Sequence, residues 1–462
     1  MAIHGITMKI SAIAMLGLLM AGATFAAPLS QLDSPAVLAI LSRAGTEGLD
    51  PGRYQNNPRE PDSVRGALLT FMRDMAEGRR ELIGLDPDVS LPARIFDAEA
   101  LVAKSENLPA MLQSLAPSDP EYARLKSALA RYRALAERGG WPVLSRSAAP
   151  EELRSRLAFE DTDTADIMQA LKRFQARHGL AADGKLGPAT LAALNAAAGD
   201  RADTIAANME RWRWLPREWE SDRIVINAAD ASLELFLGGK SMLTSRVIAG
   251  RPRDPTPILR AEGAGITVNP PWTVPASIAA REILPKLKRN PAWLASQDMV
   301  LLDGPPDDPQ GLHVNWRAIP AGTFPYRIRQ RPGPNNPLGA IKIELPNRFD
   351  VYLHDTSGKS LFAAPDRHLS HGCVRVEQIM PLASYALSAD LAATDRIADA
   401  IASGQTSYLA LSRKLPVYFL YWTAFTGADG ALQFRPDIYG RDRRMIAAMK
   451  AQRVTGEPVR CG

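Results

Sequence analysis

The sequence predicts a multidomain α+β protein, and three observations lead to this class. A chain of 462 residues is longer than a single hydrophobic core usually supports, so two or three domains are expected. Residues 33–137 place apolar side chains at three- and four-residue spacing, which is typical of helices. After residue 223 the apolar spacing changes to a two-residue period, which is typical of strands.

The first thirty residues indicate an export signal. Lys9 precedes an apolar run, residues 10–28, that ends in small residues, so we expect a signal peptide over residues 1–26 that is removed before Ala27. An uncleaved membrane anchor is the alternative, because the run approaches the length that spans a bilayer. The Gly, Ser and Thr content of the run favours cleavage. We therefore expect an exported protein with no stable transmembrane anchor.

A helical region at residues 27–150 carries no pattern that suggests chemistry, and we interpret it as a scaffold. A smaller helical unit follows within residues 166–195. Gly179 is placed to end its first helix, and Pro188 lies early in the second, where a missing N–H costs little. Three apolar residues share one face of the first helix: Ile167, Leu171 and Phe174. The pattern predicts a helical hairpin with its own core.

Residues 209–219, MERWRWLPREW, alternate arginine with tryptophan, as some nucleotide-stacking surfaces do. Ile205, Met209 and Trp212 share helical spacing, however, which favours core packing with arginines that extend towards solvent. The net charge of +5 is small and scattered. We therefore expect no nucleic-acid partner.

The strand region begins with residues 223–237, in which apolar residues alternate, and Gly238-Gly239 then predicts a hairpin turn before residues 240–250. A second strand-like stretch covers residues 339–355, and a third covers 415–425. Between them, residues 269–337 are rich in proline. Long loops of this kind are functional lids or disordered, and three tryptophans here (Trp272, Trp293 and Trp316) favour an ordered insertion.

The segment HLSHGCVRVE, residues 368–377, holds one of only two cysteines and two of six histidines. His354 ends a strand-like stretch nineteen residues before Cys373, so neighbouring segments can bring an imidazole to the thiol. At its usual pKa of about 8.5 a thiol is only slightly ionised near neutral pH, so a nucleophilic cysteine needs such a partner. A nearby imidazolium stabilises the thiolate and can return the proton to a leaving amine. Cys461 is next to last and has no chemical context.

Gly372 directly precedes Cys373 and lets the backbone approach a substrate closely. The N–H groups around Gly372 and Cys373 are therefore candidates for an oxyanion hole, and His371 is a candidate support for that loop or for the base. Three alternatives stay open. His368, His371 and Cys373 could bind zinc, although no fourth ligand is evident. Cys373 could be buried and inert. A cysteine hydrolase would use the same groups.

The motif around Cys373 resembles the signature of the L,D-transpeptidase (YkuD-type) catalytic domain, which is a histidine, a loop of fitting length and Ser-His-Gly-Cys. Other stretches resemble the large, multidomain YcbB-like branch: NPPWTVPASIAAREILPKL, IRQRPGPNNPLG, LPNRFDVYLHDT, LPVYFLYWTAF and FRPDIYGRD. FQARHGL and DGKLGPATLAALN resemble the peptidoglycan-binding type 1 module. A spacer that binds nothing is the alternative for that module.

The resemblance implies roles for residues of this chain. Cys373 would be the nucleophile and His354 the general base, with the backbone around His371, Gly372 and Cys373 as the oxyanion hole. Arg375 stands where many members of the family have asparagine, and it would bind a substrate carboxylate or brace the loop. Arg329 is a second candidate for carboxylate binding. Neither a metal nor an organic cofactor is implied.

The implied fold is a mixed β-sheet catalytic domain with a capping insertion, a small helical peptidoglycan-binding module and a helical scaffold. We divide the chain into residues 1–26 (signal peptide), 27–150 (scaffold), 151–205 (binding module), 206–400 (catalytic domain, insertion about 269–337) and 401–462 (a C-terminal segment packed on the scaffold or catalytic domain).

The implied reaction releases D-alanine from peptidoglycan tetrapeptide stems and joins the acyl group to a diaminopimelate amine, forming 3–3 cross-links in the periplasm. The implied role is in cell-wall organisation and cell shape, with carbapenems as inhibitors and other wall-synthesis proteins as partners. The alternatives are an L,D-carboxypeptidase and a non-catalytic wall-binding scaffold.

Overall fold

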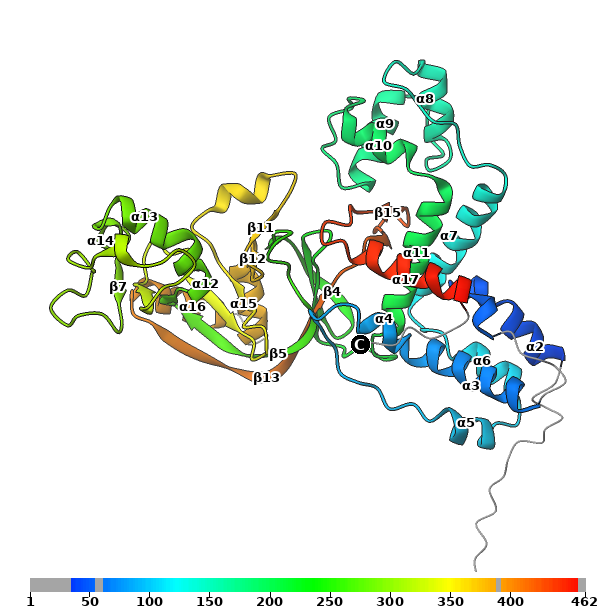
Figure 1. The fold of residues 1–462 in the computed structure, drawn as a ribbon, viewed down its shortest axis with the longest axis horizontal. Coiled ribbons are helices and arrows are strands. Elements are labelled where there is room, and N and C mark those ends of the chain that lie inside the picture. The colour runs from blue at the N-terminus through cyan, green and yellow to red at the C-terminus, as the bar shows by residue number, and fades with distance from the viewer. Residues whose placement is uncertain (1–34, 55–60, 388–391, 456–462) are drawn as a thin grey trace, which may run out of the picture.

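A computed structural model describes residues 35–54, 61–387 and 392–455 of the chain (Figure 1). The signal peptide predicted over residues 1–26 and Cys461 lie outside the described residues. Within the described ranges, no helix combines the length and the apolar content needed to cross a bilayer.

The N-terminal helices form a scaffold in which side chains cap several helix starts. Asp97, Asn107 and Asp119 each accept a hydrogen bond from an N–H of the first turn, which the helix itself leaves without a partner. Most of the scaffold helices bury apolar residues, between Val37 and Leu115, in a common core. The elements are α2 (Pro35–Ser42), η1 (Ala44–Glu47), η2 (Pro51–Tyr54), α3 (Pro61–Glu77), α4 (Arg80–Ile83), α5 (Ala98–Lys104), α6 (Leu108–Ser114) and α7 (Pro120–Glu137).

The second helical unit consists of α8 (Pro150–Leu157), α9 (Ile167–Arg177) and α10 (Pro188–Asn195), with a separate core that includes Leu171 and Phe174. Two predictions are confirmed here, since Gly179 adopts φ 65° just after α9 and Pro188 starts α10. The side chain of Gln175 donates to Asp183, Lys185 and Thr190 and accepts from Gly184 N–H, so one buried amide holds the connecting loop.

The strand-rich region is a ten-stranded mixed sheet whose pairings close on themselves. The strand order is β1-β5-β13-β2-β3-β4-β12-β10-β9, β11 pairs with β4, and β9 pairs again with β5. Closure removes exposed edges from the ring of strands. The strands are β1 (Val89–Ser90), β2 (Arg223–Asn227), β3 (Ser232–Leu237), β4 (Lys240–Gly250), β5 (Ile258–Val268), β9 (Ile341–Glu344), β10 (Leu353–His354), β11 (His368–Ser370), β12 (Val374–Val376) and β13 (Ser407–Leu420).

Alternate residues of these strands face one core, which α15 (Ile379–Leu387) and α16 (Ala392–Ala402) complete. The predicted hairpin is present, because Gly238 and Gly239 both adopt positive φ between β3 and β4. The sheet also extends past the division that we placed at residue 400, since β13 pairs in parallel with β2 and antiparallel with β5. A segment expected to pack on the domain therefore supplies an inner strand of its sheet.

Residues 269–337 form an ordered insertion with its own core around Trp316, Leu287 and Ile328. Figure 1 shows it at the opposite end of the molecule from α8, α9 and α10. Its elements are β6 (Trp272–Thr273), α12 (Ala276–Ile278), the π-helix η3 (Ala279–Ile283), α13 (Leu284–Arg289), α14 (Trp293–Ser296), β7 (Met299–Leu301), η4 (Trp316–Ala318) and β8 (Ile328–Gln330).

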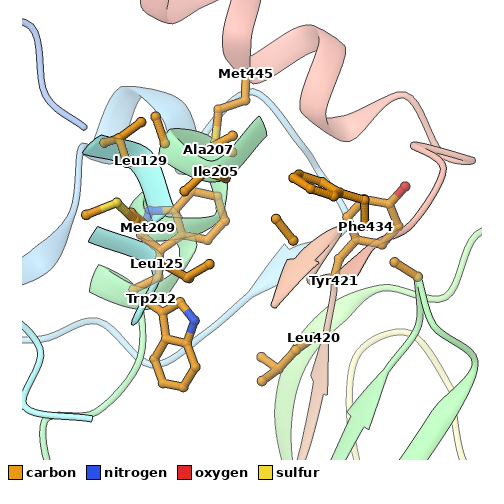
Figure 2. Close-up of a cluster of buried hydrophobic side chains, with 14 of the residues drawn as sticks. Leu125, Leu129, Ile205, Ala207, Met209, Trp212, Leu420, Tyr421, Phe434 and Met445 are labelled. Atoms are coloured by element: carbon orange, nitrogen blue, oxygen red, sulfur yellow. The ribbon is translucent and has the colours of Figure 1, made fainter. Parts of the chain in front are cut away.

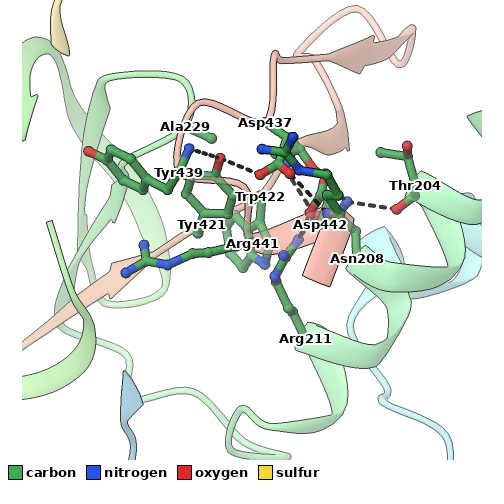
Figure 3. Close-up of polar contacts among 12 residues, drawn as sticks. Thr204, Asn208, Arg211, Ala229, Tyr421, Trp422, Asp437, Tyr439, Arg441 and Asp442 are labelled. Carbon is green, nitrogen blue, oxygen red and sulfur yellow. Dashed lines mark hydrogen bonds and ion pairs between the residues drawn. The ribbon is translucent and has the colours of Figure 1, made fainter. Parts of the chain in front are cut away.

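Helix α11 (Ala198–Arg213) joins the scaffold to the C-terminal segment, which contains β14 (Ala424–Thr426), β15 (Leu432–Phe434) and α17 (Arg441–Thr455). Figure 2 shows its apolar residues packed against α7 and the end of β13. The prediction that the arginines of α11 extend towards solvent is wrong. Arg213 is fully buried against Glu210, and Arg211 pairs with Asp442 of α17 at 2.6 Å (Figure 3).

Candidate active site

Three of the predicted site residues, Cys373, His354 and Arg375, lie on one face of the sheet, opposite the core. Leu353 of β10 and Val374 of β12 are buried in the core and pair with each other in parallel register. Because side chains alternate along a strand, Tyr352 and His354 point to the other face, and so do Cys373 and Arg375. The structure thus brings the predicted nucleophile, base and arginine to neighbouring strands.

Two cations flank the imidazole across the sheet. His354 pairs in register with Arg375 of β12 on one side and with Lys342 of β9 on the other. His354 is buried, and its Nδ1 has no hydrogen-bond partner among the described residues. Burial, with a further contribution from Arg375, lowers the pKa of His354 to about 3, so the imidazole is neutral near neutral pH.

Tyr352 contacts both members of the predicted pair. Its ring lies edge-on to the His354 ring with the centroids 5.5 Å apart, and its hydroxyl and backbone N–H lie near enough to the Cys373 sulfur to act on the thiol pKa, which they lower. The thiol itself lies 3.7 Å from the carbonyl oxygen of Asp350, which has φ 53°. A strained backbone of this kind persists only where its surroundings hold it. The Asn347 side chain does so, by accepting from the N–H groups of Phe349 and Val351.

The resting thiol is neutral as well. Burial raises the pKa of Cys373, although the hydrogen bonds from Tyr352 and the charge of Lys342 act in the opposite direction. The sequence led us to expect a thiolate stabilised by an imidazolium. The structure instead favours a neutral thiol and a neutral imidazole, because His354 is buried beside two cations and partial burial raises the pKa of Cys373.

The loop before Cys373 is held by two hydroxyl groups. Gly372 has φ 110°, a conformation that residues with a side chain rarely adopt. Thr256 is fully buried and donates to the Gly372 carbonyl at 2.9 Å while it accepts from Gly250 N–H at 2.9 Å. Ser370 donates to the Cys373 carbonyl at 2.5 Å.

The predicted oxyanion donors differ in their availability. Gly372 N–H donates to the Ser370 hydroxyl at 3.2 Å, so it is engaged within the loop. The backbone N–H groups of His371 and Cys373 have no acceptor within the described part of the chain. These two amides are therefore the donors that remain for a developing oxyanion.

His371 connects the loop to the capping insertion. Its Nε2 lies 2.7 Å from Glu282 of η3, and Arg251 contacts the same carboxylate at 2.8 Å. Although burial opposes the effect, Arg251 and His371 lower the pKa of Glu282 to about 2. His371 is thus a support of the loop. A π-helical turn, which often marks a functional position, carries its partner.

The remaining sequence candidates are placed differently. Arg375 is half-buried beside the thiol, and its Nε has no partner among the described residues. Arg329 is exposed on β8 of the insertion. His368 does not face the thiol, because its ring nitrogens contact Asp366 and the Ala228 carbonyl. The described residues contain no cluster of three or more metal-ligating side chains.

Sequence reasoning missed Tyr352, Lys342 and Asp350. A signal for Tyr352 was present, because it precedes His354 by two residues in a strand and must share its face. Lys342 could have been found only from the register of β9 against β10. Asp350 offers its backbone carbonyl, which its residue type does not reveal.

Comparison with known proteins agrees with this arrangement. Residues 221–397 match the "L,D-transpeptidase catalytic domain", residues 30–129 match the "Scaffold domain", and residues 157–194 match the "Putative peptidoglycan binding domain". A protein of Haemophilus influenzae named "Putative L,D-transpeptidase" is 33% identical over 244 residues. The match covers 53% of this chain and spans about half (49%) of that relative's length.

The resemblance and the α+β fold class that the sequence indicated are thus confirmed. The chain joins a scaffold domain and a peptidoglycan-binding domain to a catalytic domain, and residues 221–397 belong to the L,D-transpeptidase catalytic domain family.

Proposed function

We propose that the protein is a periplasmic L,D-transpeptidase that forms 3–3 cross-links by cysteine acyl transfer. The proposal keeps the domain division of the sequence analysis, with β13 added to the catalytic sheet. One observation supports it most. The buried Nδ1 of His354 has no partner, and a single tyrosine joins the His354 ring to the sulfur of Cys373. A buried polar atom without a partner requires an explanation, and a lone pair kept free for the thiol proton provides one.

In the first step, Cys373 attacks the carbonyl carbon of the third residue of a tetrapeptide stem. The thiol proton passes to His354 and then to the departing amine of D-alanine, leaving a thioester. The amides of His371 and Cys373 would donate to the oxyanion. In the second step a diaminopimelate amine attacks the thioester, His354 accepts its proton, and the thiol is regenerated.

The charges around His354 give the substrate a further role. A histidine flanked by Arg375 and Lys342 is a weak base in the free protein. A stem-peptide carboxylate bound by Arg375 would neutralise one of these charges and raise the pKa of the imidazole. The thiol would then be activated when a substrate is bound, which limits its side reactions in the free protein.

Incubation of purified protein with tetrapeptide muropeptides, followed by mass analysis, tests the proposal. We expect cross-linked dimers and free D-alanine with the wild type, and no product with Cys373→Ala, in which one small side chain replaces another. His354→Ala should slow acylation by a carbapenem by about 10²- to 10⁴-fold, the usual contribution of a general base. An active Cys373→Ala protein would refute the mechanism.

The same experiment separates the alternatives. Release of D-alanine without dimers would identify an L,D-carboxypeptidase in which water accepts the acyl group. Wall binding with no thiol reactivity would identify a scaffold. Retention of the protein on purified sacculi, and its loss when residues 157–194 are deleted, would test the binding module separately.

A further inference from the structure

A large cavity lies apart from the catalytic cysteine, between the scaffold and the catalytic sheet. It encloses about 800 Å³, which falls in the range of pockets that hold small ligands. Its floor is the second face of β2, β3 and β4, the face opposite the buried core. Its walls come from the start of α7, from α11 and the segment after it, and from residues 422–428.

Aromatic rings dominate the walls. Trp212 and Trp422 stack with centroids 4.8 Å apart and planes 9° apart, and Trp219 packs edge-on to Trp212 at 6.1 Å. Phe236 and Phe425 add two more rings. Trp212 and Trp422 come from α11 and the C-terminal segment, which lie far apart in the sequence but side by side in the fold. Half-buried rings such as Trp219 and Trp422 offer a ligand flat apolar surfaces at little entropic cost.

The charged groups of the lining largely cancel. The lining holds five carboxylates (Asp119, Glu121, Asp230, Glu234 and Glu377) and four guanidinium groups (Arg124, Arg223, Arg246 and Arg367). Most are paired. Arg246 binds Glu377, Arg124 binds Glu121, Asp230 binds Arg435, and Arg367 donates to backbone carbonyls. A cavity with compensated charges favours a neutral polar ligand over an ionic one.

Two buried donors in this lining lack an acceptor. The indole Nε1 of Trp212 and the Nε of Arg223 are both shielded from solvent and have no hydrogen-bond partner among the described residues. Trp212 as a whole is only 5% exposed. Because solvent does not reach these two atoms, a ligand in the cavity would instead meet the exposed polar side chains of the lining, such as Thr244 and Arg246.

We propose that this cavity is a saccharide-binding site for a segment of neutral N-acetylated glycan. The apolar faces of pyranose rings suit the tryptophans, and the hydroxyl and acetyl oxygens suit the hydroxyl and guanidinium groups of the lining. A stem peptide is a poorer fit, because its excess carboxylates would need cations that are already engaged. The inference rests on the proposed function, because that function identifies the polymer as peptidoglycan. The sugar chain would be bound in this cavity while its stem peptide reaches Cys373.

The position of the cavity relates it to catalysis. Arg367 and Glu377 lie in its lining, and they flank the segment 368–376 that carries Cys373 on both sides. A glycan bound here would contact the scaffold and the two ends of the catalytic segment together. It would thereby increase the effective concentration of its own stem peptides near the thiol.

Titration of the full-length Cys373→Ala protein with chitotetraose, followed by tryptophan fluorescence, tests the site without turnover. Three of the eight tryptophans line the cavity, whereas Trp141 packs on Phe159 of the wall-binding module, so a signal that is lost in the Trp422 variants is assigned to the cavity. We expect a saturable change with chitotetraose and none with free tetrapeptide. Absence of saturation, or saturation by the peptide alone, would overturn the proposal.

Matched variants test the location. Trp422→Ala should weaken binding by about tenfold or more, and Trp422→Phe, which keeps an aromatic ring, by less than about threefold. If Trp422→Ala does not fold, Glu234→Lys fills the cavity from the strand surface and should abolish binding. Glu262→Lys, on β5 outside the cavity, serves as its control and should bind as the parent protein does. Equal affinity for all variants would place the glycan elsewhere.

Measurements of activity show whether the glycan-site inference or the proposed function has failed. Trp422→Ala in the wild-type background should convert sugar-free tetrapeptides at the normal rate but glycan-linked tetrapeptides more slowly. No turnover of either substrate by the wild type would refute the proposed function, and the binding result would stand separately. Equal loss on both substrates would contradict a glycan site.

Discussion

The buried hydroxyl of Thr256 offers the sharpest test of how the catalytic loop is held. Thr256→Val keeps the size and branching of the side chain but removes the hydroxyl. Two buried backbone groups then lose their partner, the N–H of Gly250 and the carbonyl of Gly372. An unsatisfied buried group costs about 1–3 kcal/mol, so the free energy of unfolding should fall by about 2–5 kcal/mol.

The same substitution should lower activity by more than the loss of stability explains. Gly372 adopts φ 110° between the two amides assigned to the oxyanion, and its carbonyl is fixed by Thr256. A displacement of about 1 Å at a catalytic group can cost about 10²-fold in rate. We therefore expect acylation of Cys373 by a carbapenem to slow by about 10²-fold under conditions in which the variant is folded.

Urea unfolding and intact-mass acylation kinetics give the two readouts. Thr256→Ser is the matched control, because it keeps both hydrogen bonds and loses only a methyl group, worth about 1 kcal/mol. It should acylate at nearly the wild-type rate. If the valine protein were as stable and as reactive as the serine protein, the hydroxyl would not position the loop, and our account of Gly372 would be wrong.

Three other predictions follow from the site and the scaffold. Tyr352→Phe should slow acylation by about tenfold, because it removes the hydroxyl whose hydrogen bonding lowers the pKa of Cys373. Intact-mass kinetics measure the acylation rate, and a rate equal to that of the wild type would contradict this role of Tyr352. Burial raises the pKa of Cys373, and the pKa of His354 is about 3. Electrophile labelling of Cys373 in the free protein should therefore increase with pH up to alkaline values and show no step between pH 5 and 7. A labelling midpoint below neutral pH would contradict a neutral thiol beside a neutral imidazole. Glu210→Gln should destabilise the protein by about 3–5 kcal/mol, because Glu210 is buried between Arg79 and Arg213. Burial opposes ionisation of Glu210, yet the two arginines lower its pKa, so its contribution is complete above the unfolded pKa of about 4.3 and is lost as the pH falls through the lower folded value. Denaturation at several pH values should show the difference between the two proteins shrinking in acid.

Local sequence signals predicted the local structure well. Gly179, Gly238 and Gly239 adopt the positive φ that their turns require, and the alternation of residues 223–237 became two paired strands. Such features depend on neighbouring residues, whose conformational preferences act within a few positions. The insertion at residues 269–337 was also expected to be ordered, and its tryptophans do take part in its packing.

Features set by distant partners were not predictable in the same way. The arginines of α11 were expected near solvent, but Arg211 meets Asp442, a partner more than two hundred residues later in the chain. The lowered pKa of His354 depends first on burial and then on Arg375 and Lys342, which only the strand register places on either side of it. Burial and charge at the site are properties of the assembled sheet, so the sequence motif indicated the candidate reactive groups but not their protonation.

The C-terminal segment shows that the motif around Cys373 cannot form the site without distant parts of the chain. Strand β13 lies between β2 and β5, so the ring of strands closes only when residues 407–420 are in place. The residues that follow then support the catalytic loop: the Tyr439 hydroxyl donates to the Gly250 carbonyl at 2.6 Å, and Arg441 donates to the Thr256 carbonyl at 2.9 Å. Figure 3 shows both residues beside the polar network that ties this segment to α11. Because Thr256 in turn fixes Gly372, the geometry around Cys373 depends on a chain of contacts that runs back to the scaffold. The scaffold and the catalytic domain are therefore separate in the sequence, but both stabilise the loop that carries Cys373.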